Sequence, residues 1–376
     1  MTEETVSSTH PLLPPTSEDD RLDRLRLLRS RRVGVSTYKR LLSEHGTARA
    51  ALEALPDVAR AAGLLEYRAC PMQIAEGEYR AGERLGARLV FQGEADFPHQ
   101  MSEIDDAPPM LWMRGNTELA QTASIALVGA RNASSLGTRM SRALANDLGR
   151  AGFTIVSGMA RGVDTAAHLA SLKTGTIAVF AGGVDVFYPA ENTRLGEDIA
   201  SHGLIVSEQP IGLTPIARHF PLRNRIISAL SQAMVVVEAA AKSGSLIAAR
   251  HALDQGREVL AVPGHPMEPR AAGCNMLIRD GAKLVRHSDD ILEALSTLAP
   301  DTTSPPIEAP APQQNLRQTA QLHGEILARL APAPMAEDQL IRSLDMPANV
   351  VTEQLTDLEL EGYVERATGG VVRRLN

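Results

Sequence analysis

The chain contains little cysteine and no long apolar run. Only two of its 376 residues are cysteines, Cys70 and Cys274, and they lie far apart in the sequence. This excludes a disulfide framework, and without clustered cysteine and histidine there is no zinc-site spacing. No run approaches the ~18 apolar residues of a membrane helix, and the acidic start of the chain is unlike a secretory signal. We expect a cytoplasmic protein without metal, cofactor or membrane association.

The signatures of common nucleotide-dependent and hydrolytic enzymes are also missing. A dinucleotide fold shows G-x-G-x-x-G after a strand, but here the first glycine turn reads Gly129-Ala130-Arg131. No stretch matches the phosphate-binding loop G-x-x-x-x-G-K-[ST]. Ser157 has Ile155 where the nucleophile elbow of a serine hydrolase needs glycine. The sequence therefore gives no support to NAD or FAD binding, nucleoside triphosphate hydrolysis or serine hydrolysis.

What is present is a series of apolar, β-branched segments, at residues 125–128, 153–156, 176–180 and 235–238. Such segments are typical of strands that are buried on both faces of a parallel sheet. Each leads into a glycine-bearing loop, and these loops cover residues 129–132, 157–162, 182–185 and 242–245. We predict an α/β fold whose loops gather at the carboxyl edge of the sheet.

A further loop carries the densest group of anion-binding side chains. Residues 219–228 read HFPLRNRIIS and open a helix between two strands. Glycine loops and helix N-termini let backbone N–H groups approach phosphate, and arginines add forked donors. We predict one phosphate-binding surface formed by Gly129, Arg131, Arg161, Arg223, Asn224, Arg225, Lys242, Ser243, Gly244 and Ser245. In the alternative interpretation, Arg223 and Arg225 only hold carboxylates at a helix end.

Composition divides the chain into five parts. Residues 1–20 are polar and are expected to lack fixed structure, and residues 21–115 form a helical domain followed by a connector. The α/β domain covers residues 116–298, and residues 299–314 form a proline-rich linker. Residues 315–376 show three helices and a β-hairpin, which is a winged-helix pattern.

The last of these domains lacks the positive charge that binding to duplex DNA requires. No lysine or arginine occurs between Arg342 and Arg366, and the third helix carries Glu353, Asp357, Glu359 and Glu361. An acidic face repels phosphate. We therefore predict that the winged helix contacts protein, or regulates the chain itself, and does not read a major groove.

Six motifs between about residues 125 and 285 resemble the DprA/Smf family, the bacterial DNA-processing protein A of natural transformation. They are VGAR at 128–131, SGMARGVDTAAH at 157–168, GVDVFYP at 183–189, FPLRNRII at 220–227, SGSLI at 243–247 and GCNMLI at 273–278. The family usually shows Gly-Ser-Arg in the first turn and lysine before Gly-Ile-Asp in the second, where this chain has Ala130 and Arg161. Neither difference removes a charge.

The resemblance implies an extended Rossmann-like domain, with a helical domain of the sterile-alpha-motif type before it and a winged helix after it. It also implies a function: the protein binds and protects single-stranded DNA and loads RecA onto it for recombination in natural transformation. A homodimer, RecA and single-strand-binding protein are the implied partners, and no enzymatic activity is implied. The ten residues of the phosphate-binding surface would hold the strand, with little base preference, because phosphate contacts carry no sequence information.

Charge and aromatic residues fit this expectation locally. The net charge is −7 overall, but residues 125–285 contain 16 basic and 12 acidic residues and so carry +4. Localised positive charge drives nucleic-acid affinity, whatever the total. Aromatic residues make up only 3% of the chain, yet Phe187, Tyr188 and Phe220 lie beside the predicted loops. A ring there is able to stack on an unpaired base; the alternative is that it packs inward as a loop anchor.

Four titratable residues lie next to the same loops. We expect Asp164 to satisfy free N–H groups at a helix start, His168 to be a core residue, and Asp185 to stabilise its turn. Glu238 is the best candidate for a catalytic acid, although an ion pair with the arginines is the preferred interpretation. The alternative function is therefore a Rossmann-like enzyme that binds or hydrolyses a nucleotide derivative with Glu238 and a second carboxylate.

Overall fold

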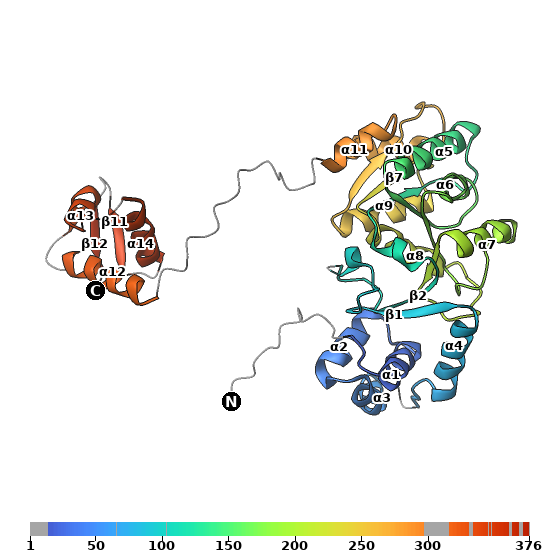
Figure 1. Cartoon of the computed structure of the whole chain (residues 1–376), viewed down its shortest axis with the longest axis horizontal. Helices are drawn as coiled ribbons and strands as arrows, with labels where there is room; N and C mark the ends of the chain where they lie inside the picture. The colour runs from blue at the N-terminus through green and yellow to red at the C-terminus, as the bar shows by residue number, and fades with distance from the viewer. Residues whose placement is uncertain are drawn as a thin grey trace. The chain divides into compact units, whose positions relative to one another are not determined.

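Nine strands of the N-terminal part form one sheet in the order β1-β2-β6-β5-β4-β3-β7-β8-β9 (Figure 1). The strands from β6 to β9 in that order are parallel, whereas β1 and β2 are antiparallel to each other and β2 is antiparallel to β6. The strands are β1 Ala87–Phe91, β2 Met110–Gly115, β3 Ser124–Val128, β4 Thr154–Ser157, β5 Thr176–Val179, β6 Leu204–Ser207, β7 Ala233–Val236, β8 Glu258–Ala261 and β9 Lys283–Leu284. The predicted parallel sheet is confirmed.

The computed structural model describes residues 14–64, 66–102, 104–296, 316–330, 334–344, 346, 348–360, 363–367 and 371–375. It divides into two compact units, residues 1–299 and 300–376. The predicted linker at 299–314 lies outside the described residues, as does most of the segment 1–20. Within that segment, the first helix already begins at Glu18.

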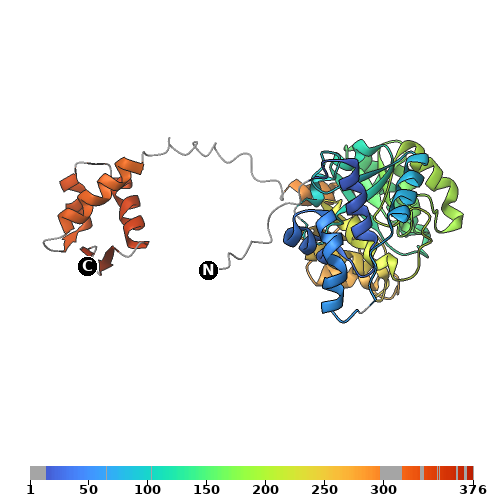
Figure 2. The same cartoon turned by 90° about the horizontal axis from the view of Figure 1, so that it is seen from below.

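Helices cover both faces of the sheet (Figure 1 and Figure 2). Ile125 and Leu127 of β3 pack in one core with α5 (Ser135–Arg150), α6 (Val163–Ser171) and α11 (Ser288–Ser296). Ala126 and Val128 point to the other face and pack in a second core with α8 (His219–Ala229), α9 (Gly244–Asp254) and α10 (Ala272–Arg279). Alternate side chains of one strand therefore enter different cores, which explains the continuous apolar runs of the sequence.

The helices after β3 and β7 lie on opposite faces, although these two strands are neighbours. Such a reversal opens a crevice beyond the carboxyl ends of the strands, where α/β proteins bind ligands. α7 (Thr193–His202) lies beside β2, β5 and β6. Short 3₁₀ helices lie at η1 His99–Met101, η2 Thr117–Gln121 and η3 Ala190–Asn192.

Four N-terminal helices pack at the β1 and β2 end of the sheet (Figure 1). They are α1 Glu18–Arg29, α2 Val35–His45, α3 Ala48–Ala61 and α4 Met72–Arg84. The buried Trp112 of β2 donates from Nε1 to the Glu78 carboxylate of α4 at 2.8 Å, and Arg29 pairs with the same carboxylate at 2.8 Å. The indole, the carboxylate and the guanidinium therefore fix α1 and α4 to β2 of the sheet.

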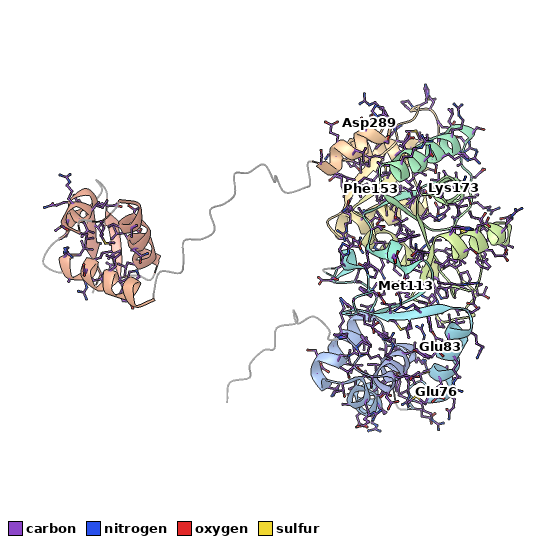
Figure 3. All side chains as sticks on the ribbon, in the orientation of Figure 1. Glu76, Glu83, Met113, Phe153, Lys173 and Asp289 are labelled. Atoms are coloured by element: carbon purple, nitrogen blue, oxygen red, sulfur yellow. The ribbon has the colours of Figure 1, made fainter. Side chains whose placement is uncertain are left out.

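The connector that we predicted within residues 21–115 is part of the sheet. β1 and β2 lie in that segment, and β2 hydrogen-bonds to β6, pairing Met113 with Val206. Met113, labelled in Figure 3, is fully buried. The α/β domain thus extends further toward the N-terminus than the expected start at residue 116. The stretch between β1 and β2 contains the prolines Pro98, Pro108 and Pro109. Because proline is typical of loops, the sequence did not indicate strands here.

The second unit contains the predicted three helices and β-hairpin. Its elements are α12 Leu316–Leu330, β10 Met335–Ala336, α13 Glu337–Leu344, α14 Ala348–Leu360, β11 Val364–Ala367 and β12 Val371–Arg374. The strands form a sheet in the order β10-β12-β11, and apolar residues of all three helices share one core. The winged-helix pattern is confirmed. Within the described part of the chain, every helix is too short or too polar to cross a membrane.

Candidate nucleic-acid interface

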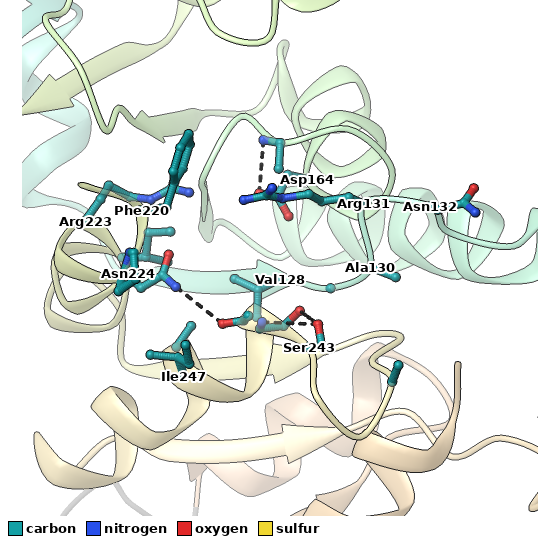
Figure 4. A pocket seen from close by; sticks show the side chains of 18 of the residues that line it. Val128, Ala130, Arg131, Asn132, Asp164, Phe220, Arg223, Asn224, Ser243 and Ile247 are labelled. Atoms are coloured by element: carbon teal, nitrogen blue, oxygen red, sulfur yellow. Dashed lines mark hydrogen bonds between the residues drawn. The ribbon is translucent and has the colours of Figure 1, made fainter. Parts of the chain in front are cut away.

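A pocket of about 780 Å³ lies beyond the carboxyl ends of β3 and β7, at the reversal point of the sheet (Figure 4). Six separate stretches line it: the loop after β3, the loop after β4 with the start of α6, Tyr188 after β5, the segment from Pro215 into α8, the loop that enters α9, and Arg270 before α10. Of the predicted phosphate-binding residues, the pocket brings together Gly129, Arg131, Arg223, Asn224, Lys242, Ser243, Gly244 and Ser245. Loops far apart in the sequence therefore line one pocket.

The first part of the pocket rim is the loop after β3, which holds Arg131. Gly129 passes so close to its neighbours that an added Cβ would lie 2.6 Å from Cγ2 of Val163 and 3.0 Å from the carbonyl oxygen of Glu238. Only glycine fits there, so the backbone leaves the strand directly over the start of α6. Arg131 is exposed, and its guanidinium carbon lies 5.2 Å from the centre of the Phe220 ring. This cation–π contact holds charge and ring together at the pocket rim.

The second part of the pocket rim is the N-terminus of α9. Ser243 caps this helix by accepting from the N–H of Ser245 at 3.3 Å, and the first turn contains no acidic residue. The positive end of the helix dipole therefore faces the pocket, with the exposed Lys242 beside it. Asn224 donates to the carbonyl of Gly244 at 3.5 Å and so joins α8 to this rim (Figure 4).

Arg270 is a pocket cation that sequence analysis missed. It lines the pocket from the loop between β8 and α10, and 43% of its side chain is exposed. Its Nε lies 4.0 Å from Oε1 of Glu238. The glycine loops that guided the prediction follow strands directly, whereas Arg270 comes several residues after β8. Its only signal in the sequence is its position just before the Gly273 motif.

Arg223 is buried beneath the pocket and donates hydrogen bonds to two carbonyl oxygens. Its Nη1 donates to the carbonyl oxygens of Gly158 and of Val179, the latter at 2.7 Å. These carbonyls follow β4 and end β5, so one guanidinium ties two strand ends together. Burial lowers the pKa of Arg223 to about 10, which keeps it charged at neutral pH. Arg223 therefore supplies positive charge from below while it also holds the loops.

Asp164 lies beside Arg223 and is also buried. Its Oδ2 accepts from the N–H groups of Gly158 and Ala160, both at 3.2 Å, so it organises the loop after β4 as predicted. Burial raises the pKa of Asp164 to about 6, against the opposing effect of the Arg223 charge. A carboxyl group with such a pKa is ionised for most of the time at neutral pH and is easily protonated below it.

Two predicted arginines lie outside the pocket lining. Arg225, one residue beyond Asn224 on α8, pairs with Glu208 and donates to the carbonyl of Asp106 at 2.5 Å. Its side chain is only 10% exposed, so the alternative role that we considered, an arginine holding a carboxylate, describes its contacts. Arg161 is exposed near the pocket, 3.6 Å from Glu191. It remains a candidate for contact with a ligand that extends beyond the pocket.

The three aromatic candidates separate into two groups. Tyr188 is 50% exposed and lines the pocket together with Phe220, with the two ring centres 5.6 Å apart. Phe187 instead packs edge-on against Phe180, at 6.0 Å between ring centres, and fills the space next to Gly196. Phe187 is thus an inward loop anchor, whereas Tyr188 and Phe220 offer faces to a ligand.

The remaining titratable residues have structural partners. Glu238 accepts from the N–H and from the hydroxyl of Ser134, each at 3.0 Å for Oε2, just before α5. His168 is buried, contacts the Thr176 hydroxyl at 2.7 Å, and has its pKa lowered to about 3 by burial. Asp185 accepts from the N–H of Gly212 at 2.8 Å. Among the described residues, no group of three or more His, Cys, Asp or Glu side chains is placed to hold a metal.

Three family models match the chain. The model of DNA recombination-mediator protein A matches residues 88–296, the DprA-like N-terminal HHH domain matches residues 18–81, and the DprA winged helix domain matches residues 309–370. The matched ranges follow the helical, α/β and winged-helix parts of the fold. The start of the first match at residue 88 agrees with the inclusion of β1 and β2 in the sheet.

Individual known proteins that resemble this chain come from the same family as the matching models. The chain is 38% identical to Protein Smf of Escherichia coli over 74% of its own length and 75% of that protein. It is 44% identical to DNA processing protein DprA of Streptococcus pneumoniae over 52% of its own length and 70% of that protein.

The X-ray structure of the S. pneumoniae protein superposes with a TM-score of 0.59 at 32% identity, covering 73% of this chain and 96% of the other. A Helicobacter pylori DprA structure, whose subject is its single-stranded DNA binding mode, superposes with a TM-score of 0.52 at 30% identity, covering 56% of this chain and 96% of the other. The chain belongs to the DNA recombination-mediator protein A (DprA/Smf) family.

Proposed function

We propose that this chain binds single-stranded DNA in the pocket at the carboxyl edge of its sheet. The observation that carries the proposal is the arrangement of three exposed or half-exposed cations, Arg131, Lys242 and Arg270, around the N-terminus of α9. These groups bind phosphate oxygens. Tyr188 and Phe220 stand at the same pocket and offer stacking faces, which a duplex with its bases paired inside does not use.

The biological role that we propose is the one implied by the family. The protein protects incoming or resected single strands and loads RecA onto them for recombination in natural transformation. Single-strand-binding protein and a second copy of the chain are the other proposed partners. The H. pylori relative, described for its single-stranded DNA binding mode, supports the ligand class. Two subunits would present two pockets to one strand, and multivalency would then raise the affinity for longer strands.

Binding without turnover fits the chemistry of the pocket. The two carboxylates considered for acid–base catalysis both accept backbone N–H groups, Asp164 from Gly158 and Ala160, and Glu238 from Ser134. Oε1 of Glu238 also lies 4.0 Å from Nε of Arg270. A general base must be free to take a proton from a substrate. These carboxylates are used to hold loops in place, so we propose that the chain is not an enzyme.

The winged helix has a separate proposed role. Its third helix, α14, spans residues that carry acidic side chains and no lysine or arginine. Recognition of a duplex places such a helix against phosphate-lined grooves, which disfavour negative charge. We propose that this domain contacts protein or regulates binding by the first unit.

An equilibrium titration of a fluorescent dT oligonucleotide tests the proposed function. With three phosphate contacts, affinity is expected to fall about 20-fold between 50 and 200 mM salt, and a duplex of equal length should bind much more weakly. Glu238→Gln should leave the affinity unchanged. Equal affinity for duplex and single strand would contradict the proposal. Turnover of a nucleotide that Glu238→Gln abolishes would establish the enzyme alternative instead.

A further inference from the structure

Glu238 lies next to the proposed DNA pocket, although its charge opposes phosphate binding. The residue follows β7, its side chain is only 9% exposed, and it lines a neighbouring hollow together with Ser134 and Gly137. A carboxylate repels phosphate, so electrostatics alone predicts that removal of Glu238 raises the affinity for a strand. The contacts of the residue predict the opposite result.

Glu238 contacts both ends of the loop that carries Arg131. At one end, its carbonyl oxygen lies against Gly129, where an added Cβ would be 3.0 Å from that oxygen. At the other end, its carboxylate accepts from the N–H of Ser134, at 3.0 Å for Oε2 and 3.3 Å for Oε1, and from the Ser134 hydroxyl at 3.0 Å. Arg131 lies between these two attachments and is exposed. The position of its loop therefore depends on Glu238.

The same carboxylate is complementary to the N-terminus of α5. Ser134 caps this helix by accepting from the N–H of Gly137 at 3.0 Å, and the first turn contains no acidic residue. The helix dipole favours a negative charge at this end. Gly137 provides the space for it, because a Cβ added there would overlap Oε2 of Glu238. The charge of Glu238 is therefore balanced in part by α5.

A third segment meets Glu238 through Arg270. Oε1 of Glu238 lies 4.0 Å from Nε of Arg270, in the loop between β8 and α10. One carboxylate thus joins the loop of Arg131, the start of α5 and the side chain of Arg270. Arg131 and Arg270 are two of the cations around the pocket. Their distance from each other is set through a residue that itself bears the wrong charge for the ligand.

We propose that Glu238 is a positioning residue for DNA binding. Its carboxylate holds Arg131 and Arg270 in the arrangement that phosphates require, and this gain exceeds the repulsion from its own charge. The inference rests on the proposed function. It gives Glu238 an effect on affinity that is opposite in sign to the effect of its charge, and this makes the role measurable.

Anisotropy titrations of a fluorescent dT strand at low salt compare Glu238→Ala and Glu238→Gln with the wild type. Alanine removes the acceptor and is expected to weaken binding about tenfold, the loss typical of one charge-assisted contact. Glutamine loses the charge but keeps an oxygen for Ser134, so the affinity should stay within about twofold of the wild type. Glu191→Ala is the matched control, since it removes an exposed acid beside Arg161, and it should not lower the affinity.

Gly137→Ala tests the position of the carboxylate without any change of charge. The added methyl group displaces the flexible end of Glu238 from Ser134, while alanine suits a helix better than glycine. We expect the variant to fold, with a thermal unfolding temperature near that of the wild type, and to bind the strand about fivefold more weakly. It also replaces Glu238→Ala if that protein does not fold.

The effect of Glu238→Ala should depend on the cations through which it acts. In Arg131→Ala/Arg270→Ala protein it should cost less than about twofold. A tenfold loss in that background would mean general damage to the fold and would overturn the inference. So would an affinity of Glu238→Ala or Gly137→Ala that equals or exceeds that of the wild type. Absence of binding by the wild type would instead refute the proposed function itself.

Discussion

Replacement of Arg131 and Lys242 together by alanine lowers the affinity for single-stranded DNA about a hundredfold at moderate salt. Both side chains are exposed at the rim of the pocket, one on the loop after β3 and the other at the N-terminus of α9. A charge-assisted contact contributes roughly 1.5 kcal/mol, so the loss of two corresponds to about two powers of ten. The measurement is fluorescence anisotropy over a series of salt concentrations. The slope of log affinity against log salt should also become shallower by about 1.4.

Arg150→Ala is the control for this experiment. Arg150 is exposed at the C-terminal end of α5, the opposite end of the helix from the pocket. Its loss removes the same charge from the same domain and should change the affinity less than twofold. A comparable loss in Arg150→Ala would mean that binding follows net charge and not the pocket.

Replacement of Arg225 by alanine destabilises the fold and leaves DNA binding by the folded protein largely intact. The Arg225 and Glu208 side chains are only 10% and 17% exposed, and Arg225 also donates to the carbonyl of Asp106. Removal of one partner from a buried pair leaves an uncompensated charge and typically costs about 3–5 kcal/mol. Urea unfolding of the variant and of the wild type measures the difference in the free energy of unfolding.

The cost of this substitution should depend on pH. Burial raises the pKa of Glu208 above its ordinary value, and the Arg225 charge opposes that rise. In Arg225→Ala the opposing charge is gone, so the pKa rises further. A carboxyl group whose pKa is higher in the folded than in the unfolded state favours folding when it is protonated. The destabilisation should therefore shrink as the pH falls from 7 toward 5.

The result also decides between the two interpretations of the arginine segment. If Arg225→Ala unfolds like the wild type but loses affinity for the strand, Arg225 contacts DNA. Glu208→Gln is the matched variant, since it keeps a hydrogen-bonding partner for Arg225 and removes the charge. It should be less destabilising than Arg225→Ala and should show no loss of affinity.

The sequence was sufficient to predict the parallel sheet and the gathering of its glycine loops at one edge. The four strands that the sequence indicated are short and largely apolar because both faces are covered, and each leads into a loop that contains glycine. Those two features required no knowledge of tertiary contacts, so the strands and the loops that follow them appear where they were expected. The carboxyl ends of parallel strands meet at one edge, which brings Gly129, Lys242 and their neighbours into one pocket.

The sequence could not distinguish the roles of Arg223 and Arg225. Residues two apart on a helix point about 200° apart around its axis, so the two side chains face different surroundings. One reaches strand-end carbonyls below the pocket, and the other reaches Glu208 and Asp106. Which side faces the pocket depends on the packing of α8 against the sheet, and residue type alone does not contain that information.

Two other features depended on the tertiary fold. β1 and β2 are separated by a stretch with several prolines, and β2 finds its partner β6 about 90 positions later in the chain. Arg270 reaches the pocket only because the loop between β8 and α10 passes back toward Glu238. Long-range contacts of this kind leave no periodic signal in the sequence.

Ultraviolet cross-linking of a bromodeoxyuridine-containing single strand to the full chain, followed by identification of the joined peptides, tests the central claim most directly. We predict cross-links within residues 183–189 or 219–228, since Tyr188 and Phe220 offer the ring faces at the pocket. They should disappear when an excess of unlabelled dT strand is added and weaken in Arg131→Ala/Lys242→Ala. Cross-links confined to α1–α4 or to residues 316–375 would contradict the assignment of the strand to this pocket.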